Sequence, residues 1–163
     1  MMNTKEAVIR QASEEDFDQA ADLVVRMKRL NGEFDPLFRV VDDAKERAVR
    51  YLRESAGAEG HLVLVATRGP KVLGVLISEV TERVFYHPSR EGRITDFYIL
   101  PEWRRRALGD DMLQQASAKL KQMGAEMIVA EFPARNEIAS SFYVKRGFRA
   151  LVNTFAIEDE KDQ

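Results

Sequence analysis

The chain has 163 residues, of which 25 are Lys or Arg and 27 are Asp or Glu, for a formal net charge of −2. Because positive and negative charges are nearly equal in number, net charge gives no reason to expect binding to nucleic acid or to a membrane. The sequence holds no cysteine and two histidines, which argues against a metal site of His and Cys ligands and excludes thiol chemistry.

The length suits one domain over residues 1–163, and the acidic residues 158–163 are expected to fray. No apolar run approaches the roughly 18 residues that span a bilayer, and the N-terminal residues lack an apolar signal core. We therefore expect a cytoplasmic protein.

The first third of the chain predicts one strand and two helices. Residues 7–12 favour a strand, and Ser13 with Asp16 three positions later resembles a capping box at the start of a helix. Turn residues at 31–36 separate this helix from a second one at about residues 42–54.

The middle of the chain predicts a three-stranded meander. Residues 61–67 and 72–84 are rich in strand-forming residues, and residues 68–71 between them contain a Gly-Pro pair typical of a hairpin turn. A third run at residues 93–100 follows another set of turn residues. We expect the three strands to pair antiparallel in chain order.

The last third predicts a helix, a strand, a second helix and a final strand. Apolar residues recur every three or four positions over residues 109–123, and residues 127–132 favour a strand. A helix is expected at residues 136–146 and a last strand at residues 148–157. The order predicts an α+β fold with a mixed, mostly antiparallel β-sheet flanked by α-helices.

The segment between the third strand and the next helix has the features of an anion site. Small residues at Ala107 and Gly109 let the backbone approach a ligand closely, and free amides at the helix start attract a diphosphate. Three adjacent arginines add positive charge: Arg104, Arg105 and Arg106. Asp110 must then point away from the anion. In the alternative interpretation, the arginines merely solvate a loop and Gly109 merely helps to start a helix.

A second pattern, Asn136-x6-Tyr143-x3-Gly147-Phe148, follows at a fitting distance. With both patterns in place, residues 94–148 resemble the central motifs of the GNAT superfamily of N-acetyltransferases, and residues 9–16 resemble its first strand and helix start. The resemblance implies a GNAT-type sheet with a splayed pair of strands at the coenzyme site. It also implies transfer of an acetyl group from acetyl-CoA to a primary amine, without a metal.

The resemblance implies a set of coenzyme-binding residues. They are Phe97, Tyr98, Ile99, Arg104, Arg105, Arg106, Ala107, Leu108, Gly109, Asp110, Asn136 and Tyr143. Ala107 stands where the family usually has glycine, and a positive φ there costs alanine about 1 kcal/mol. Asn136 alone is equally well explained as a helix N-cap, and Tyr143 alone as an aromatic residue packed in the core.

The expected chemistry needs a base, because an amine with a pKa near 10.4 is protonated at neutral pH. Glu131 resembles the base position of the family's protein N-terminal acetyltransferases, and Asp96 is the alternative. Both are equally readable as ordinary charged strand residues. Tyr143 matches the family's general acid, which donates a proton to the leaving thiolate.

The acceptor is the least determined part. The resemblance assigns it to residues 27–41 and 152–157, where Glu33 and Asp35 either meet a cationic amine or keep a loop soluble. A small amine, a polyamine, a protein lysine or an N-terminus all remain open. The chain ends soon after Ile157, so we expect an exposed strand edge and a homodimer. The alternatives are a non-catalytic CoA-binding regulatory module and an interaction domain that binds no coenzyme.

Overall fold

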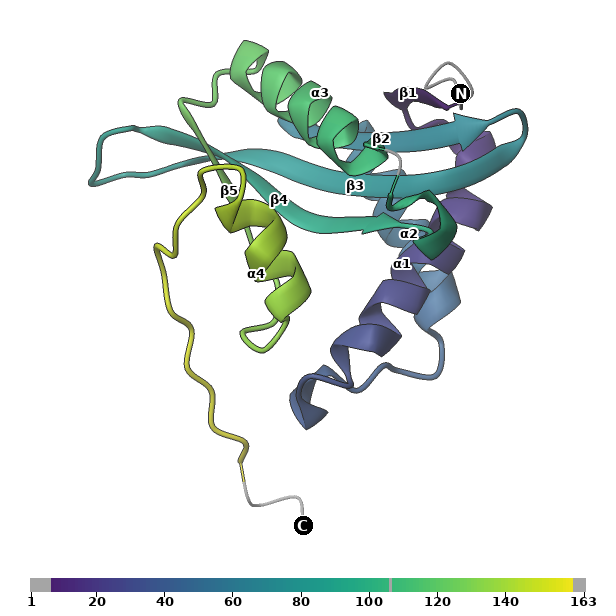
Figure 1. The fold of residues 1–163 in the computed structure, drawn as a ribbon, viewed down its shortest axis with the longest axis horizontal. Coiled ribbons are helices and arrows are strands. Elements are labelled where there is room, and N and C mark those ends of the chain that lie inside the picture. Colours follow the sequence, from purple (N-terminus) through teal and green to yellow (C-terminus); the bar gives the residue numbers. More distant parts are fainter. Residues whose placement is uncertain (1–6, 106, 160–163) are drawn as a thin grey trace.

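The sheet is the centre of the fold (Figure 1). A computed structural model describes residues 7–105 and 107–159. Within them, five strands form one sheet in the order β1-β2-β3-β4-β5, with β1 to β4 antiparallel and β5 parallel to β4. The strands are β1 (Val8–Gln11), β2 (His61–Arg68), β3 (Lys71–Glu82), β4 (Arg90–Ile99) and β5 (Met127–Ala130). The predicted α+β class and the meander are confirmed.

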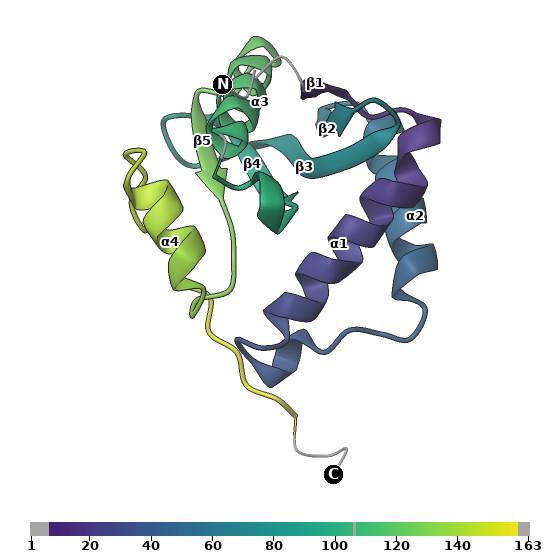
Figure 2. The ribbon, with the colours of Figure 1, turned by 45° about the vertical axis from the view of Figure 1, so that its right-hand side comes forward.

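Helices cover both faces of the sheet (Figures 1 and 2). They are α1 (Phe17–Asn31), α2 (Ala44–Gly57), α3 (Leu108–Gln122) and α4 (Glu137–Val144), with 3-10 turns at Glu14–Asp16 (η2), Pro36–Phe38 (η3) and Pro101–Trp103 (η4). The first two helices pack side by side on one face, while α3 lies on the other face with α4 beside it. No helix in the described part of the chain is long and apolar enough to cross a membrane.

The predicted capping pair at the start of the first helix is present. The backbone amide of Ser13 donates to the Asp16 carboxylate at 2.8 Å, although a 3-10 turn precedes α1. Arg10 on β1 donates to both oxygens of that carboxylate, at 2.6 and 2.8 Å. These bonds, led by the one from Arg10, hold the pKa of the buried Asp16 below its usual value. The carboxylate therefore ties strand β1 to helix α1.

Strand β4 changes its neighbours half-way along its length. Opposite β3, the register shifts between Ile77 and Ser78, which leaves Thr95 as the extra residue of a β-bulge. On the other side, pairing with β5 ends where Ile94 meets Ala130. From Thr95 to Ile99, β4 therefore pairs with β3 alone.

The prediction of a last strand at residues 148–157 is wrong. In the structure these residues belong to no helix or strand, and the chain after α4 runs in an extended path away from the sheet (Figure 1). The composition favours a strand, but a strand forms by pairing with a neighbour. The chain offers these residues no paired neighbour in the described structure.

Candidate functional site

The loop between β4 and α3 ends in a left-handed residue. Ala107 has φ 59° and ψ 6° and directly precedes the first residue of α3, Leu108. We expected strain at Ala107 if its φ is positive, and the structure shows a positive φ there. Because the first amides of a helix have no partner within it, this turn leaves donors at the start of α3 for an anion.

The charged residues of this loop have different environments. The Nε of Arg104 donates to the carbonyl of Ile99 at 2.9 Å, and its guanidinium lies over the ring of Tyr98 at 5.0 Å. Arg104 therefore fastens the loop back onto β4. Arg105 is exposed, whereas Arg106 lies outside the described residues.

Asp110, in the first turn of α3, has its charge balanced by an arginine that follows α4. The Nε of Arg146 donates to the Asp110 carboxylate, which lowers the pKa of that carboxyl group. The guanidinium also lies over the Phe142 ring, 3.7 Å from its centroid. As a result, Asp110 leaves little uncompensated negative charge beside the loop. No local pattern along the chain predicts this role of Arg146.

Gly109 lies where α4 packs closely against α3, so the site has little room for a larger side chain. A Cβ placed there would lie 3.3 Å from Cε2 of Phe142 and 3.6 Å from Cδ1 of Ile99. The Phe142 ring in turn meets Phe97 edge to face, with centroids 6.0 Å apart. The missing side chain thus lets α4 approach the free half of β4.

Asn136 and Tyr143 lie at opposite ends of α4. The side chain of Asn136 accepts from the amide of Ala139 at 3.0 Å, so it is a helix N-cap, as its alternative interpretation predicted. Tyr143 is 7% exposed, stacks on Phe132 at 5.6 Å and meets Phe148 edge to face at 5.1 Å. Burial raises the pKa of Tyr143, so its hydroxyl keeps its proton at neutral pH.

The two candidate bases sit in different surroundings. Asp96 is 4% exposed; its carboxylate accepts the ammonium of Lys28 on α1 and, at 2.9 Å, the hydroxyl of Thr95. Tyr51 of α2 lies close to Thr95 and Asp96, and partial burial raises the pKa of the Tyr51 hydroxyl. The sequence did not single out Lys28 or Tyr51, because nothing in a helix pattern reveals which strand residue faces it.

Glu131 follows directly after β5 and is exposed. Its carboxylate accepts from Nη2 of Arg93 at 2.9 Å, and its backbone amide donates to the carbonyl of Ile94 at 3.1 Å. Glu131 thus stands at the point where β5 leaves β4, one strand away from Asp96.

Comparison with known protein families shows which family this chain belongs to. The model of the Acetyltransferase (GNAT) family matches residues 27–148, which is most of the chain. The chain belongs to the GNAT family. No curated protein matches this GNAT chain.

Solved structures show the same fold. A transcriptional regulator from Bacillus halodurans is 21% identical, with a TM-score of 0.74 over 94% of this chain and 99% of its own. A predicted acetyltransferase with acetyl-CoA from Clostridium acetobutylicum is 15% identical, with a TM-score of 0.76 over 93% and 96%. An aminoglycoside N-acetyltransferase in complex with CoA is 12% identical, with a TM-score of 0.73 over 94% and 95%. At identities this low, the likeness shows the fold.

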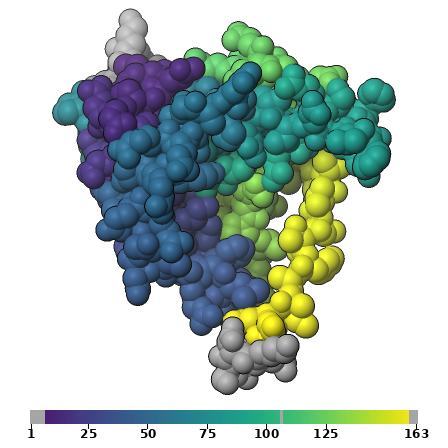
Figure 3. Space-filling view, turned by 180° about the vertical axis from the view of Figure 1, so that it is seen from behind, coloured from purple at the N-terminus to yellow at the C-terminus, as the bar shows by residue number. Residues whose placement is uncertain are grey.

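One face of this GNAT protein is hollowed. Viewed from behind, the space-filling surface dips between the α1–α2 layer and the extended residues 149–159, with α4 visible between them (Figure 3). At the far end, Nη2 of Arg39 beside η3 lies 3.5 Å from the carboxylate of Glu158. Residues 27–41 and 152–157, which the family resemblance implies for the acceptor, both border this face. Among the described residues, no group of three or more His, Asp or Glu side chains is arranged to hold a metal.

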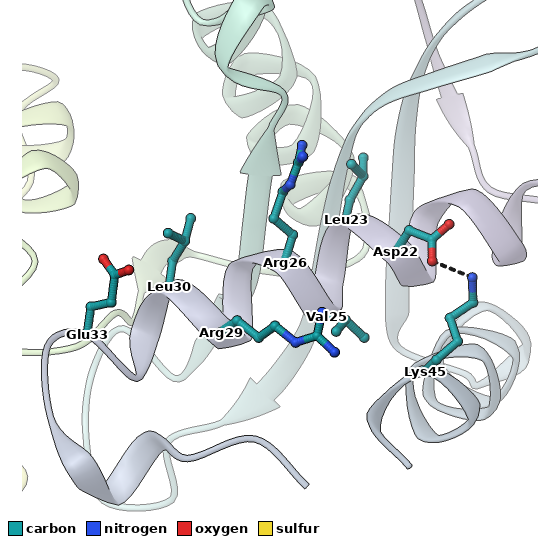
Figure 4. Close-up of a pocket in the computed structure, with 8 residues that line it drawn as sticks. All are labelled: Asp22, Leu23, Val25, Arg26, Arg29, Leu30, Glu33 and Lys45. Atoms are coloured by element: carbon teal, nitrogen blue, oxygen red, sulfur yellow. Dashed lines mark hydrogen bonds and ion pairs between the residues drawn. The ribbon is translucent and has the colours of Figure 1, made fainter. Parts of the chain in front are cut away.

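A separate depression of about 650 Å³ lies along α1 (Figure 4). Charged residues three or four positions apart dominate its lining, and the Lys45 ammonium contacts Asp22 there at 2.5 Å. Its lining residues are Asp22, Leu23, Val25, Arg26, Arg29, Leu30, Glu33 and Lys45. Lys28 is not among them, since the helical period points it toward Asp96 instead. This depression is therefore distinct from the groups around β4.

Proposed function

We propose that the protein transfers an acetyl group from acetyl-CoA to a primary amine. The observation that carries the proposal is the arrangement around Thr95–Ile99, the half of β4 that β5 leaves free. The left-handed turn into α3 follows this half of β4. Within it, Phe97 meets Phe142, whose ring in turn contacts the buried Tyr143. The neighbouring Asp96 accepts the ammonium of Lys28 on α1. Membership of an acetyltransferase family supports the same chemistry.

Acetyl-CoA is the co-substrate that fits this loop best. Its diphosphate matches amides at the start of α3, the exposed charge of Arg105 and an Asp110 that Arg146 has neutralised. Its extended pantetheine arm matches the backbone edge around Phe97 and Tyr98, which has donors and acceptors that β5 does not use, whereas the Ile99 carbonyl is taken by Arg104. In this proposal Arg104 positions the loop, because its guanidinium is already bound to Ile99 and Tyr98.

The transfer needs two proton movements. The neutral amine nitrogen attacks the thioester carbonyl carbon, a C–N bond forms, and the C–S bond breaks with its electron pair leaving on sulfur. A base takes the proton that the nitrogen loses, and Tyr143 gives its proton to the thiolate. Burial keeps Tyr143 protonated, which suits a proton donor.

For the base, the surroundings favour Asp96 over Glu131. The Asp96 carboxylate is buried and already accepts a primary ammonium, that of Lys28, so a substrate amine has a fitting contact there. The Glu131 carboxylate is held at the surface by Arg93. We therefore propose that the acceptor enters from the α1–α2 face, through the hollow of Figure 3.

A binding titration followed by a turnover assay tests the function. Calorimetry with acetyl-CoA should give saturable binding, and thiol release should rise with at least one member of a panel of small amines, polyamines and lysine peptides. Arg105→Glu should weaken coenzyme binding by about tenfold or more, since it reverses charge beside a diphosphate. Lys121→Glu, at the far end of α3, is the matched control and should bind normally.

Each outcome of these assays has a defined meaning. Absence of binding at millimolar acetyl-CoA rules out the transferase and the CoA-binding module alike. Binding without thiol release on any amine rejects the transferase and favours the regulatory module. Equal binding by wild type and Arg105→Glu removes Arg105 from the phosphate site.

A further inference from the structure

Two carboxylates are buried in the described part of the chain, and they hold different cations. Asp16 is bound by the guanidinium of Arg10, whereas Asp96 is bound by the ammonium of Lys28. Lys45 also pairs with carboxylates, but those side chains are 64% and 82% exposed. Lys28 thus combines a primary amine with a buried acceptor for its proton.

A lysine at such a site has chemistry that an arginine lacks. A guanidinium keeps its protons in proteins, whereas an ammonium with a pKa of about 10.4 can pass a proton to a carboxylate in contact with it and become a nucleophile. The Lys28 side chain is 46% exposed, so packing does not lock its flexible stem, and Nζ has room to move off Asp96. Lys28 therefore has the two properties that an acetyl acceptor needs, a removable proton and freedom to approach a thioester.

Lys28 also meets β4 where the proposed coenzyme ends. With the diphosphate at the turn after Ile99, the pantetheine arm runs back along β4 past Tyr98, which brings the thioester toward the far end of the free half. That end is the β-bulge at Thr95, and the next residue is Asp96. Nζ of Lys28 contacts the Asp96 carboxylate there. The lysine amine and the acetyl group thus meet at the same two residues of β4.

We propose that Lys28 is a modification site, and that each chain transfers the acetyl group of acetyl-CoA to Nζ of its own Lys28. The inference rests on the proposed acetyl transfer and names one acceptor for it. An external amine that uses Asp96 has to displace Lys28 first, whereas Lys28 is already in contact with that carboxylate. Self-acetylation therefore needs only the coenzyme to bind.

The step uses the same proton movements as transfer to an external amine. The Lys28 ammonium gives a proton to Asp96, the neutral Nζ attacks the thioester carbonyl carbon, a C–N bond forms, and the C–S bond breaks with its electron pair leaving on sulfur. Tyr143 gives its proton to that thiolate. Of the three ammonium protons, one passes through Asp96 to water, one restores Tyr143 and one stays on the amide nitrogen. The products are acetylated Lys28 and the thiol of coenzyme A.

The surroundings of Asp96 suit the neutral product. The hydroxyl of Thr95 donates to the Asp96 carboxylate at 2.9 Å, independently of Lys28. The amide N–H of the acetylated lysine is a further donor, so the buried carboxylate keeps partners after the ammonium is lost. Because an acetylated lysine has no free amine, each chain accepts one acetyl group at this position.

A purely structural ion pair makes the opposite prediction. Contact with a carboxylate keeps Lys28 in its ammonium form, so unassisted acetylation would reach it more slowly than the exposed Lys121. Transfer assisted by a general base instead makes Lys28 the faster of the two, by a factor of about 10² to 10⁴. The order of these two rates therefore distinguishes the two roles of Lys28.

Mass spectrometry of the protein incubated with acetyl-CoA alone tests the proposal. Wild type should gain one acetyl group on Lys28 at least about 100-fold faster than on Lys121, and should release one thiol per chain without any added amine. The rate per chain should not depend on protein concentration, because one chain holds both the acceptor and the coenzyme. In urea-unfolded protein the two lysines should react at similar rates.

Three variants locate the reaction. Lys28→Arg keeps a cation beside Asp96 but should abolish both the fast acetylation and the thiol release in the absence of added amine. Lys45→Arg removes a lysine whose carboxylate partners are exposed, and should leave the fast acetylation of Lys28 unchanged. Asp96→Asn should slow the acetylation of Lys28 by about 10² to 10⁴-fold, to near the rate of Lys121.

The outcomes separate this inference from the proposed function. If acetyl-CoA binds while Lys28 is unmodified, or is modified no faster than Lys121, self-acetylation is overturned, and thiol release with an external amine still upholds the transferase. A rate per chain that rises in proportion to protein concentration assigns the transfer to a second copy and overturns transfer within one chain. Failure of acetyl-CoA to bind overturns both proposals.

Discussion

Lys28 on α1 donates its ammonium to the carboxylate of Asp96 on β4, 68 positions away in the sequence. The Asp96 side chain is 4% exposed and that of Lys28 is 46% exposed, so the pair closes the buried carboxylate off from one side. A carboxylate buried without a partner would be costly, which is why an ammonium stands there. The Lys28 ammonium therefore compensates the charge of the buried carboxylate. Its position is also a place where a primary ammonium group fits.

Asp96→Asn should lower turnover by about 10² to 10⁴-fold while acetyl-CoA binds normally, because the change removes the base and keeps the shape. The loss should shrink as pH rises, since the free amine becomes abundant near its pKa of about 10.4. Thiol-release rates measured across the pH range are the readout.

Glu131→Gln is the matched control for Asp96→Asn. It removes a carboxylate that is ion-paired with Arg93 at the surface and should keep turnover within a few-fold of wild type. Normal rates in Asp96→Asn together with slow turnover in Glu131→Gln would transfer the role of base to Glu131.

Ala107→Gly should stabilise the fold by about 1 kcal/mol, because glycine adopts a positive φ without the strain that alanine carries. Thermal unfolding should show a melting temperature about 2 to 4 °C higher. Coenzyme affinity should rise or stay equal, since the turn keeps its shape.

Ala118→Gly provides the control for this gain. It makes the same change at an exposed position inside α3 and should destabilise by about 1 kcal/mol. A lower melting temperature in Ala107→Gly would show that the alanine side chain contributes packing that outweighs its strain.

Tyr143→Phe should reduce turnover by about 10² to 10⁴-fold with little change in coenzyme affinity, as it removes one hydroxyl and keeps the packed ring. A second readout comes from its raised pKa. The folded state favours the protonated phenol, so its contribution to stability is present below the unfolded pKa of about 10 and is lost above it. The stability of wild type should therefore fall more steeply above pH 10 than that of Tyr143→Phe. Equal turnover in the two proteins would leave Tyr143 with a packing role alone.

Asp16→Asn should destabilise the protein by about 1 to 3 kcal/mol at pH 7, because the change weakens the bonds from Arg10 and Ser13. The folded pKa of Asp16 is lowered, so its contribution is present above the unfolded pKa of about 3.9 and is lost as pH falls through the folded pKa. Denaturant unfolding should thus show wild type and variant converging in acid.

Asp18→Asn is the control for the Asp16 experiment, since the Asp18 side chain is 82% exposed. Its stability should stay within about 0.5 kcal/mol of wild type. A pH-independent difference between Asp16→Asn and wild type would mean that the carboxylate's charge is not what stabilises the helix start.

Local signals were enough to predict most of the fold and part of the candidate site. The 3.6-residue period of α3 and the Gly-Pro turn between β2 and β3 are local patterns. Each predicts the structure of the same few residues that carry it. The same holds for the Asn136 cap and for the strain at Ala107, which depend on the backbone nearby. The closeness of Gly109 to Phe142 has no local signal, because it depends on how α4 crosses α3.

The sequence by itself determined the order of the elements, the small residues of the β4–α3 loop and the family motifs, since each depends on residues that are neighbours along the chain. Tertiary structure decided which charges meet: it brought Lys28 to Asp96, Arg93 to Glu131 and Arg146 to Asp110. It also decided that residues 148–157 form no strand, although their composition favours one. The physical reason is shared, because an ion pair and a strand both require a partner that only folding can bring close.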